Sequence, residues 1–341
     1  MVQLTSRRGF FGRFFRLAVG ALFVALVIGV GLVGYLSLRP YGGGQTFVEI
    51  ERGMSSRDIA QLLAAEGVVR SPWIFMGIRA LHPKASLEAG EYRFDSPETP
   101  WAVFNKIRRG EVFYEEFTVP EGSNIFDIAA LLERGDTVNA GAFLKAAADP
   151  ASIRDLDPQA PDLEGYLFPS TYRVTHRTTA GQLCHVMTAE FRRQWNALGG
   201  RAHSTDVHRI VTLASLIEKE TAVSGERPLV AAVFLNRLQL NMPLQCDPTT
   251  VYAALLENRY RGAIHKSDLA SENPYNTYAH AGLPPGPIAN PGASSLKGAL
   301  EPANVDYLYF VAKGDGSGSH HFSSTLLEHE KAVLAYRKTA H

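Results

Sequence analysis

The segment from Ala214 to Thr221, ASLIEKET, places two carboxylates, Glu218 and Glu220, in an otherwise apolar stretch that begins at Val207. A buried carboxylate is costly unless it is paired or used chemically. Such a group either belongs to an ion-paired network or has a raised pKa and can donate a proton. The spacing predicts a helix with both glutamates at the borders of its apolar face, so periodicity leaves open which of them reacts.

Two further helices are predicted to pack beside this segment. Apolar residues recur at helical spacing over 179–195. Another helix is expected after Ser224, which can cap it, with Pro228 in the first turn. Together with 207–221, these helices predict a helical core around a buried glutamate.

The chain also repeats itself, because 53–63 lines up with 122–132 at a constant offset of 69 residues. Each copy follows an alternating strand and is typical of a turn and a short amphipathic helix. Two copies are too few for a solenoid, so they indicate small β-α modules. They resemble LysM-like modules, which bind glycans rich in N-acetylglucosamine. The alternative for the first copy is a β-α packing unit, and the second copy is expected to belong to the larger body that follows.

Polar loops rich in proline follow the third helix, at 244–250, 272–278 and 282–292. Proline removes the flexibility that a linker needs, so we expect these loops to line a cleft. A solvated structural loop is the alternative. The aromatic segment 163–172 could bind sugar rings, although an aromatic corner of the core is the preferred interpretation.

An uncharged run of 22 residues extends from Leu17 to Leu38 and is long enough to cross a bilayer. Four arginines precede it and Arg39 follows it, so the positive-inside rule predicts a cytoplasmic N-terminus and an exported body. A cleaved signal peptide is the weaker interpretation. The apolar run exceeds the usual signal core, and no A-x-A site follows before the glycine linker at 42–44.

The charge balance and the two cysteines constrain the function less. Only five arginines precede Pro40, which leaves 29 basic and 34 acidic residues after it. The body therefore lacks the dense basic face that nucleic acid binding requires. Cys184 and Cys246 could form a disulfide outside the cytoplasm or remain two buried thiols, and the sequence leaves both open.

Several motifs that occur in one order resemble the endolytic murein transglycosylases of the YceG-like family. The similarity covers the membrane anchor and nearly everything in 47–329. One departure is Cys246, where a small polar residue is expected. The motifs are EGYLFPSTY at 164–172, ASLIEKET at 214–221, ERPLVAAVFLNRL at 226–238, LQCDPT at 244–249, NPYNTY at 273–278, GLPPGPIANPG at 282–292 and DYLYFVAKGDGSGSHHF at 306–322.

The resemblance implies an α+β protein of the bacterial inner membrane with its catalytic domain in the periplasm. It implies an enzyme that cuts nascent peptidoglycan glycan strands internally, between N-acetylmuramic acid and N-acetylglucosamine, and leaves 1,6-anhydro ends. No cofactor and no metal are expected, and membrane-bound peptidoglycan synthases are possible partners. The expected organisation is a cytoplasmic N-terminus (1–16), a transmembrane helix (17–38), a linker (39–46), a LysM-like module (47–115) and a catalytic domain (116–341).

The resemblance also implies that Glu218 acts, first as a protonated acid and then as a base. A hydrolase would normally need a second carboxylate about 5 to 9.5 Å away. Glu220 is too near in sequence and on another flank of the helix, so we expect it to be a supporting carboxylate, paired with Arg227 or Arg237. Further residues expected to bind sugar or stabilise the developing charge are Glu164, Tyr166, Gln245, Asp247, Asn276 and Tyr278.

Other function classes remain as alternatives. A metal hydrolase could use His320, His321 and His329 with Glu328 and Glu330, but their spacing is not that of an H-E-x-x-H ligand set. A non-catalytic, membrane-anchored scaffold that binds peptidoglycan and recruits synthases would explain the modules and the anchor. It would not explain the buried glutamates. A hydrolytic muramidase is the third alternative.

Overall fold

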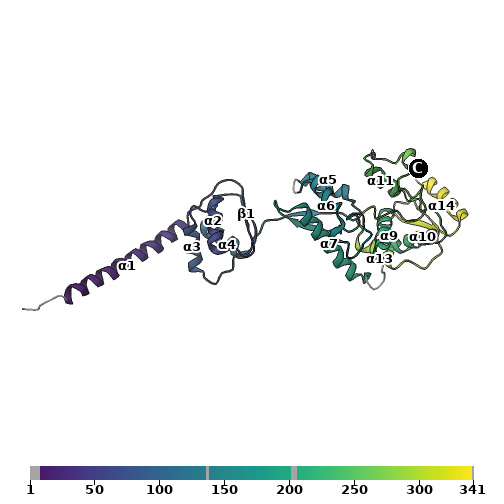
Figure 1. The fold of residues 1–341 in the computed structure, drawn as a ribbon. Helices are drawn as coiled ribbons and strands as arrows, with labels where there is room; N and C mark the ends of the chain where they lie inside the picture. Colours follow the sequence, from purple (N-terminus) through teal and green to yellow (C-terminus); the bar gives the residue numbers. More distant parts are fainter. Residues whose placement is uncertain (1–7, 136–137, 201–205, 340–341) are drawn as a thin grey trace, which may run out of the picture. The chain divides into compact units, whose positions relative to one another are not determined.

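The computed structural model describes residues 8–135, 138–200 and 206–339 (Figure 1). The chain divides into two compact units, Met1–Glu115 and Glu116–His341, and each has its own apolar core. Helices predominate, and every sheet in the described part of the chain has two strands. The mixed α+β class predicted from the sequence is confirmed.

The first unit begins with the long helix α1, Arg8–Ser37. Its segment Phe15–Ser37 is long and apolar enough to cross a membrane, with a mean hydropathy of 2.6. The predicted span, 17–38, coincides with this segment to within two residues. A single apolar helix near the N-terminus is compatible with a single-pass membrane anchor.

The rest of the first unit is a strand-helix-helix-strand arrangement with one further helix (Figure 1). The two strands pair antiparallel, from Thr46 opposite Phe94 to Ile50 opposite Gly90. Their inward side chains join those of the helices in one apolar core. The elements are β1 (Thr46–Ile50), α2 (Ser56–Ala65), α3 (Pro72–Leu81), β2 (Gly90–Phe94) and α4 (Pro100–Arg109).

The sequence repeat has the same local structure in both copies. Gly53 and Gly122 have φ angles of 87° and 75°, a left-handed backbone that glycine adopts without a steric penalty. Ser55 and Asn124 then cap the helices that follow, α2 and α5 (Ile125–Gly135), by accepting a backbone N–H three residues further on. The offset of 69 residues therefore repeats a glycine turn and a helix cap.

The second unit places α9 among other helices. The strand β3 (Glu115–Thr118) leads into this unit and pairs with β4. The helix α9 packs against α10, α11 and α13 (Figure 1). The elements are α5, α6 (Ala140–Ala147), η1 (Pro150–Ser152), β4 (Thr171–Val174), α7 (Ala180–Ala197), α9 (Val207–Glu220), η2 (Ser224–Glu226), α10 (Arg227–Gln239), α11 (Asp247–Leu256), α12 (Lys266–Leu269) and α13 (Ala293–Leu300).

The helices α11 and α13 were not predicted from the sequence. The first of them begins at Asp247, inside the segment 244–250 that we expected to be an irregular loop. Pro248 occupies its first turn, where the missing N–H of proline leaves no hydrogen bond unmade. The proline that indicated a loop therefore starts a helix.

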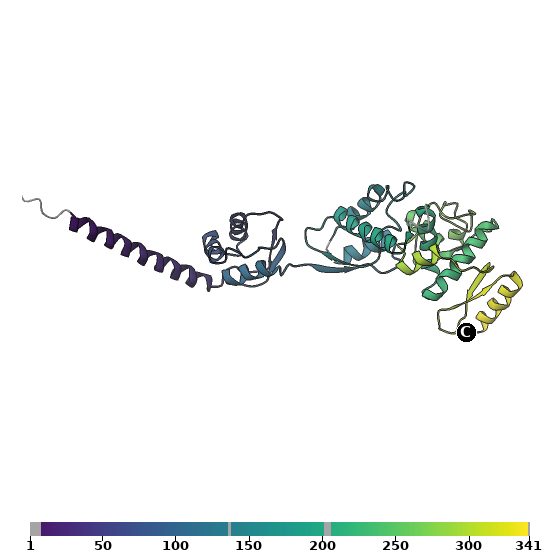
Figure 2. The ribbon, with the colours of Figure 1, turned by 90° about the horizontal axis from the view of Figure 1, so that it is seen from below.

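The C-terminal part of the second unit is a hairpin with a helix beside it. The strands β5 (Tyr309–Ala312) and β6 (His320–Ser323) pair antiparallel. The helix α14 (Leu326–Thr339) packs against both strands, as the yellow end of the ribbon shows in Figure 2. This arrangement brings α14 next to the helical core.

Candidate active site

The last turn of α9 directs its two glutamates into different surroundings. Successive residues of a helix are rotated by about 100°, so Glu218 and Glu220 point about 200° apart. Glu218 contacts the start of α10 and the loop before α13. Glu220 contacts the residue that precedes α11. Tertiary contacts thus separate two side chains that the sequence left equivalent.

Glu218 is held on both of its oxygens. Arg227 Nη2 donates to Glu218 Oε1 at 2.9 Å, and the Gly292 N–H donates to Oε2 at 2.9 Å. The side chains of Glu218 and Arg227 are only 5% and 7% exposed. The same guanidinium nitrogen lies 3.6 Å from Glu121 Oε2. Both oxygens of Glu218 are therefore held by donors, one from a charged side chain and one from the backbone.

Two glycines allow the backbone to approach these carboxylates. A Cβ atom on Gly292 would lie 2.0 Å from Glu121 Oε1, so a side chain there would displace that carboxylate. Gly122 has a left-handed backbone, and its carbonyl accepts from Lys219 Nζ at 3.1 Å. The second copy of the repeat therefore serves as one wall of the Glu218 site.

Glu220 lines a cavity of about 240 Å³. Burial raises the pKa of its carboxyl. The thiol of Cys246 opposes this shift, because its Sγ donates to Glu220 Oε1 at 2.9 Å. The nearby charge of Asp247 raises the pKa further. A carboxyl whose pKa is raised at the wall of a cavity is a candidate general acid.

The Glu220 cavity also contains three of the other residues that the sequence predicted for the site: Gln245, Asp247 and Tyr278. The Tyr278 hydroxyl donates to Asp247 Oδ1 at 2.6 Å and fixes that carboxylate. Gln245 has a φ angle of 52°, which is uncommon for a residue other than glycine. Backbone strain of this kind concentrates at functional sites.

Asp247 changes the argument that we made about hydrolysis. In the sequence, Glu220 was rejected as the second carboxylate of a hydrolase, and Asp247 was expected only to bind sugar or stabilise the developing charge. In the structure Asp247 lines the same cavity as Glu220. Two carboxyl groups are therefore present at this cavity. The products of the reaction must distinguish anhydro-ring formation from hydrolysis.

Glu164 is buried away from this cavity. Burial raises the pKa of its carboxyl to about 8. Its Oε2 accepts from the Ile125 N–H and its Oε1 from Asn290 Nδ2, both at 2.9 Å. Asn290 Oδ1 in turn accepts the Leu167 N–H. Glu164 therefore ties the start of α5 to the loop before α13.

Tyr166 and Asn276 are also fully buried. The Tyr166 hydroxyl donates to Asp157. The Asn276 side-chain amide donates to the carbonyls of Leu269 and Ser271, at 3.1 and 2.7 Å. Both side chains are therefore held by partners within the fold, and neither lines the Glu220 cavity.

The expected arginine partners of Glu220 are engaged elsewhere. Arg227 pairs with Glu218. Arg237 lines the Glu220 cavity, but it donates to the carbonyls of Leu308 and Leu244, at 2.7 and 3.0 Å. The two cysteines are both free and buried. Neither arginine is therefore an ion-pair partner of Glu220, whose pKa is raised by burial.

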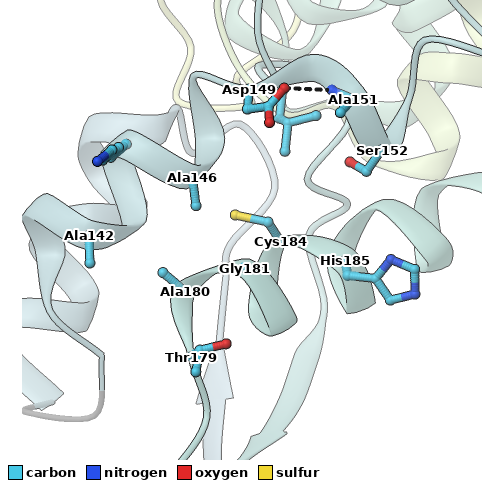
Figure 3. Close-up of a pocket in the computed structure, with 12 residues that line it drawn as sticks. Ala142, Ala146, Asp149, Ala151, Ser152, Thr179, Ala180, Gly181, Cys184 and His185 are labelled. Atoms are coloured by element: carbon cyan, nitrogen blue, oxygen red, sulfur yellow. Dashed lines mark hydrogen bonds between the residues drawn. The ribbon is translucent and has the colours of Figure 1, made fainter.

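A larger cavity of about 710 Å³ lies between α6 and α7 (Figure 3). Cys184 and His185 line it, and Asp149 accepts the Ala151 N–H at its edge. Burial raises the pKa of the Cys184 thiol to about 12, so this thiol is a poor nucleophile. Volume alone does not identify the reactive cavity.

The histidines considered for a metal hydrolase have other contacts. His320 Nδ1 lies 2.7 Å from Glu226 Oε2. His329 stacks on Tyr309 with ring centroids 5.1 Å apart, and it lines the Glu220 cavity. Within 8–135, 138–200 and 206–339, no three or more His, Cys, Asp or Glu side chains are placed to hold a metal ion.

Comparison with known proteins identifies the family. The model of the YceG-like family matches residues 48–335. The chain belongs to the YceG-like family. A relative named endolytic murein transglycosylase from Bacillus subtilis is 33% identical over 309 residues, which are 85% of this chain and 84% of that protein. The resemblance recognised in the sequence motifs is thereby confirmed.

Two more comparisons agree with this YceG-like assignment. An endolytic murein transglycosylase of Streptococcus pneumoniae D39 is 28% identical over 352 residues, which are 92% of this chain and 64% of that protein. The crystal structure of a YceG-like protein from Listeria monocytogenes is 32% identical, with a TM-score of 0.55. That alignment covers 85% of this chain and 99% of the Listeria chain.

Sequence reasoning missed Glu121 and Gly292 of this YceG-like site, and it considered His329 only as a metal ligand. Glu121 and Gly292 frame Glu218, and His329 reaches the Glu220 cavity from α14. The motif GLPPGPIANPG at 282–292 was a signal for one of them, because its last glycine had no assigned purpose. The position of His329 depends on how α14 packs, for which the local sequence gives no indication.

Proposed function

We propose that this YceG-like protein is an endolytic murein transglycosylase and that Glu220 is its acid and base. The assignment of the residue rests on the difference between the two glutamates. Glu220 lines a cavity and the pKa of its carboxyl is raised, whereas Arg227 and the Gly292 N–H hold both oxygens of Glu218. The relatives that bear this name support the activity. This proposal gives Glu220 the role that the sequence resemblance implied for Glu218.

In this reaction Glu220 first donates a proton and then accepts another. Protonated Glu220 donates to the oxygen that joins C1 of N-acetylmuramic acid to the next N-acetylglucosamine, and the C1–O bond breaks. The resulting Glu220 carboxylate then accepts the proton of the C6 hydroxyl of the same muramoyl residue. The C6 oxygen bonds to C1 and closes the 1,6-anhydro ring. The carboxyl is thereby protonated again, and no water is consumed.

Asp247 has a second role in this proposal. Bond cleavage leaves positive charge on C1 and the ring oxygen, and a fixed carboxylate stabilises such charge without reorganising. The hydrogen bond from Tyr278 fixes Asp247 in the cavity that Glu220 lines. Gln245 presents an amide to the same cavity, where it is suited to bind the N-acetyl groups or hydroxyls of the sugars.

The products of the reaction test the function. The full chain in detergent, incubated with uncleaved glycan strands, is expected to yield internal fragments with 1,6-anhydromuramoyl ends, measured by mass spectrometry. Reducing ends without the anhydro ring would contradict the proposal and indicate a hydrolase. Intact strands after prolonged incubation would favour the non-catalytic scaffold.

Replacing Cys246 tests the proton on Glu220 through the pH dependence of kcat. The hydrogen bond from this thiol favours the charged carboxylate and lowers the Glu220 pKa, so Cys246→Ala is expected to raise it. Since the acid must be protonated, activity is lost as pH rises through this pKa, and the alkaline limb should move to higher pH. In Cys246→Ser the stronger hydroxyl donor should move it to lower pH. Limbs that coincide in all three proteins would contradict the assignment.

We also propose that α1 anchors the protein in the bacterial inner membrane with its N-terminus in the cytoplasm. The arginines before the apolar segment and the single Arg39 after it support this orientation. Tethering would raise the local concentration of the enzyme near strands that emerge from membrane-bound synthases. A periplasm-specific reporter fused after His341 should be active, and activity of a cytoplasm-specific reporter instead would reverse the orientation.

For the segment 47–115 we retain the proposal of a LysM-like module. The order strand, helix, helix, strand, with the two strands antiparallel, supports it. A packing unit without a ligand is the alternative. Sedimentation with insoluble murein would distinguish them, if it were compared between the full chain and a chain from which this segment has been removed.

A further inference from the structure

A second cavity, of about 580 Å³, has one lining residue in common with the cavity that Glu220 lines. Asp247, the first residue of α11, lines both cavities. On α9, Lys219 lines the second cavity and the next residue, Glu220, lines the first. Both cavities are therefore lined by the end of α9 and the start of α11, close to the proposed acid.

The lining of the second cavity combines aromatic and polar groups. Phe126 and Tyr252 contribute rings whose centroids lie 6.2 Å apart. Tyr260 contributes a third ring and is 40% exposed. Asn124 and Asp127, at the start of α5, provide amide and carboxylate groups. Aromatic faces beside hydrogen-bonding groups match sugars, whose C–H faces stack while their hydroxyl and acetamido groups bond.

We propose that this second cavity binds the glycan strand on one side of the bond that is cut. The inference rests on the proposed function, because an enzyme that cuts internally must hold sugars on both sides of the bond. At about 240 Å³ the Glu220 cavity is the smaller of the two, and Asp247 lines both of them. The occupant is a chain of N-acetylated amino sugars, and Tyr260 stacks on one of its rings.

The experiment compares the KM for long, uncleaved strands in the full chain and its variants. Tyr260→Ala removes an exposed ring and is expected to raise KM about fivefold, with the larger part of the change in KM rather than kcat. Val251→Trp places a bulky side chain in the same cavity and is expected to raise KM at least as much. The matched control is Leu256→Ala, an apolar truncation on α11 that does not line the cavity and should leave KM unchanged.

The outcomes separate this inference from the function on which it rests. If the unaltered protein forms anhydro ends but Tyr260→Ala and Val251→Trp leave KM unchanged, the second cavity does not bind the strand and the function stands. If the unaltered protein forms no such ends, the function fails. In that case, binding of glycan oligomers to a full chain that carries Glu220→Gln still measures the cavity. Equal affinity with and without Tyr260→Ala would then overturn the inference.

Discussion

Replacing Glu220 by glutamine is expected to lower kcat about 10³-fold, because the amide can neither donate the acidic proton nor accept the one from the C6 hydroxyl. Glu218→Gln is the matched control, since it makes the same change two residues earlier on the same helix. The control should retain most of kcat when rates are expressed per folded molecule. Release of anhydromuramoyl fragments, followed by mass spectrometry, gives both rates.

The pair of variants is decisive because the two glutamates were equivalent in the sequence. A large loss of kcat in Glu218→Gln with little loss in Glu220→Gln would restore the role that the sequence resemblance implied. Losses of equal size would indicate that the two carboxylates act as one unit. Their different contacts would then not distinguish a catalytic from a structural glutamate.

Removing the charge of Arg227 is expected to have the largest effect on stability. Arg227→Met should lower the free energy of unfolding of the second unit by about 3 to 5 kcal/mol, because it leaves the Glu218 carboxylate buried without its partner. Both side chains are almost fully buried, so solvent cannot replace the lost interaction. Urea unfolding followed by circular dichroism measures the change.

A double variant shows whether the loss comes from the unpaired charge. Arg227→Met combined with Glu218→Gln removes both charges and should recover much of the free energy that Arg227→Met loses, so the two effects are not additive. If Arg227→Met alone cost less than about 1 kcal/mol, in the range of an exposed ion pair, the Arg227–Glu218 pair would not be a major source of stability.

Elements with strong periodicity were predicted well from the sequence. The helix expected over 207–221 is α9, Val207–Glu220, and that over 179–195 is α7, Ala180–Ala197. The helices α11 and α13 were missed, since they lie among prolines and glycines that indicate loops when they are considered one by one. Local signals could not show that Pro248 lies in a first turn.

The sequence predicted which segments contribute to the site, but not how their side chains are arranged. Gln245, Asp247 and Tyr278 do line the cavity with a glutamate from ASLIEKET. What distinguishes Glu218 is contact with Arg227 and Gly292, which are 9 and 74 residues away in the chain. The residue type alone does not show whether a polar side chain is buried in a hydrogen-bond network or faces a cavity. For this reason Glu164, Tyr166 and Asn276 could not be separated from the residues of the cavity.

The two different surroundings at the end of α9 also limit how this helix can change in evolution. Inserting or deleting one residue within α9 would rotate its last turn by about 100° relative to the rest of the helix. Such a change would move Glu218 away from Arg227 and Glu220 away from the cavity at the same time. The length of α9 between Val207 and Glu220 is therefore expected to vary less than the type of its exposed residue Arg209.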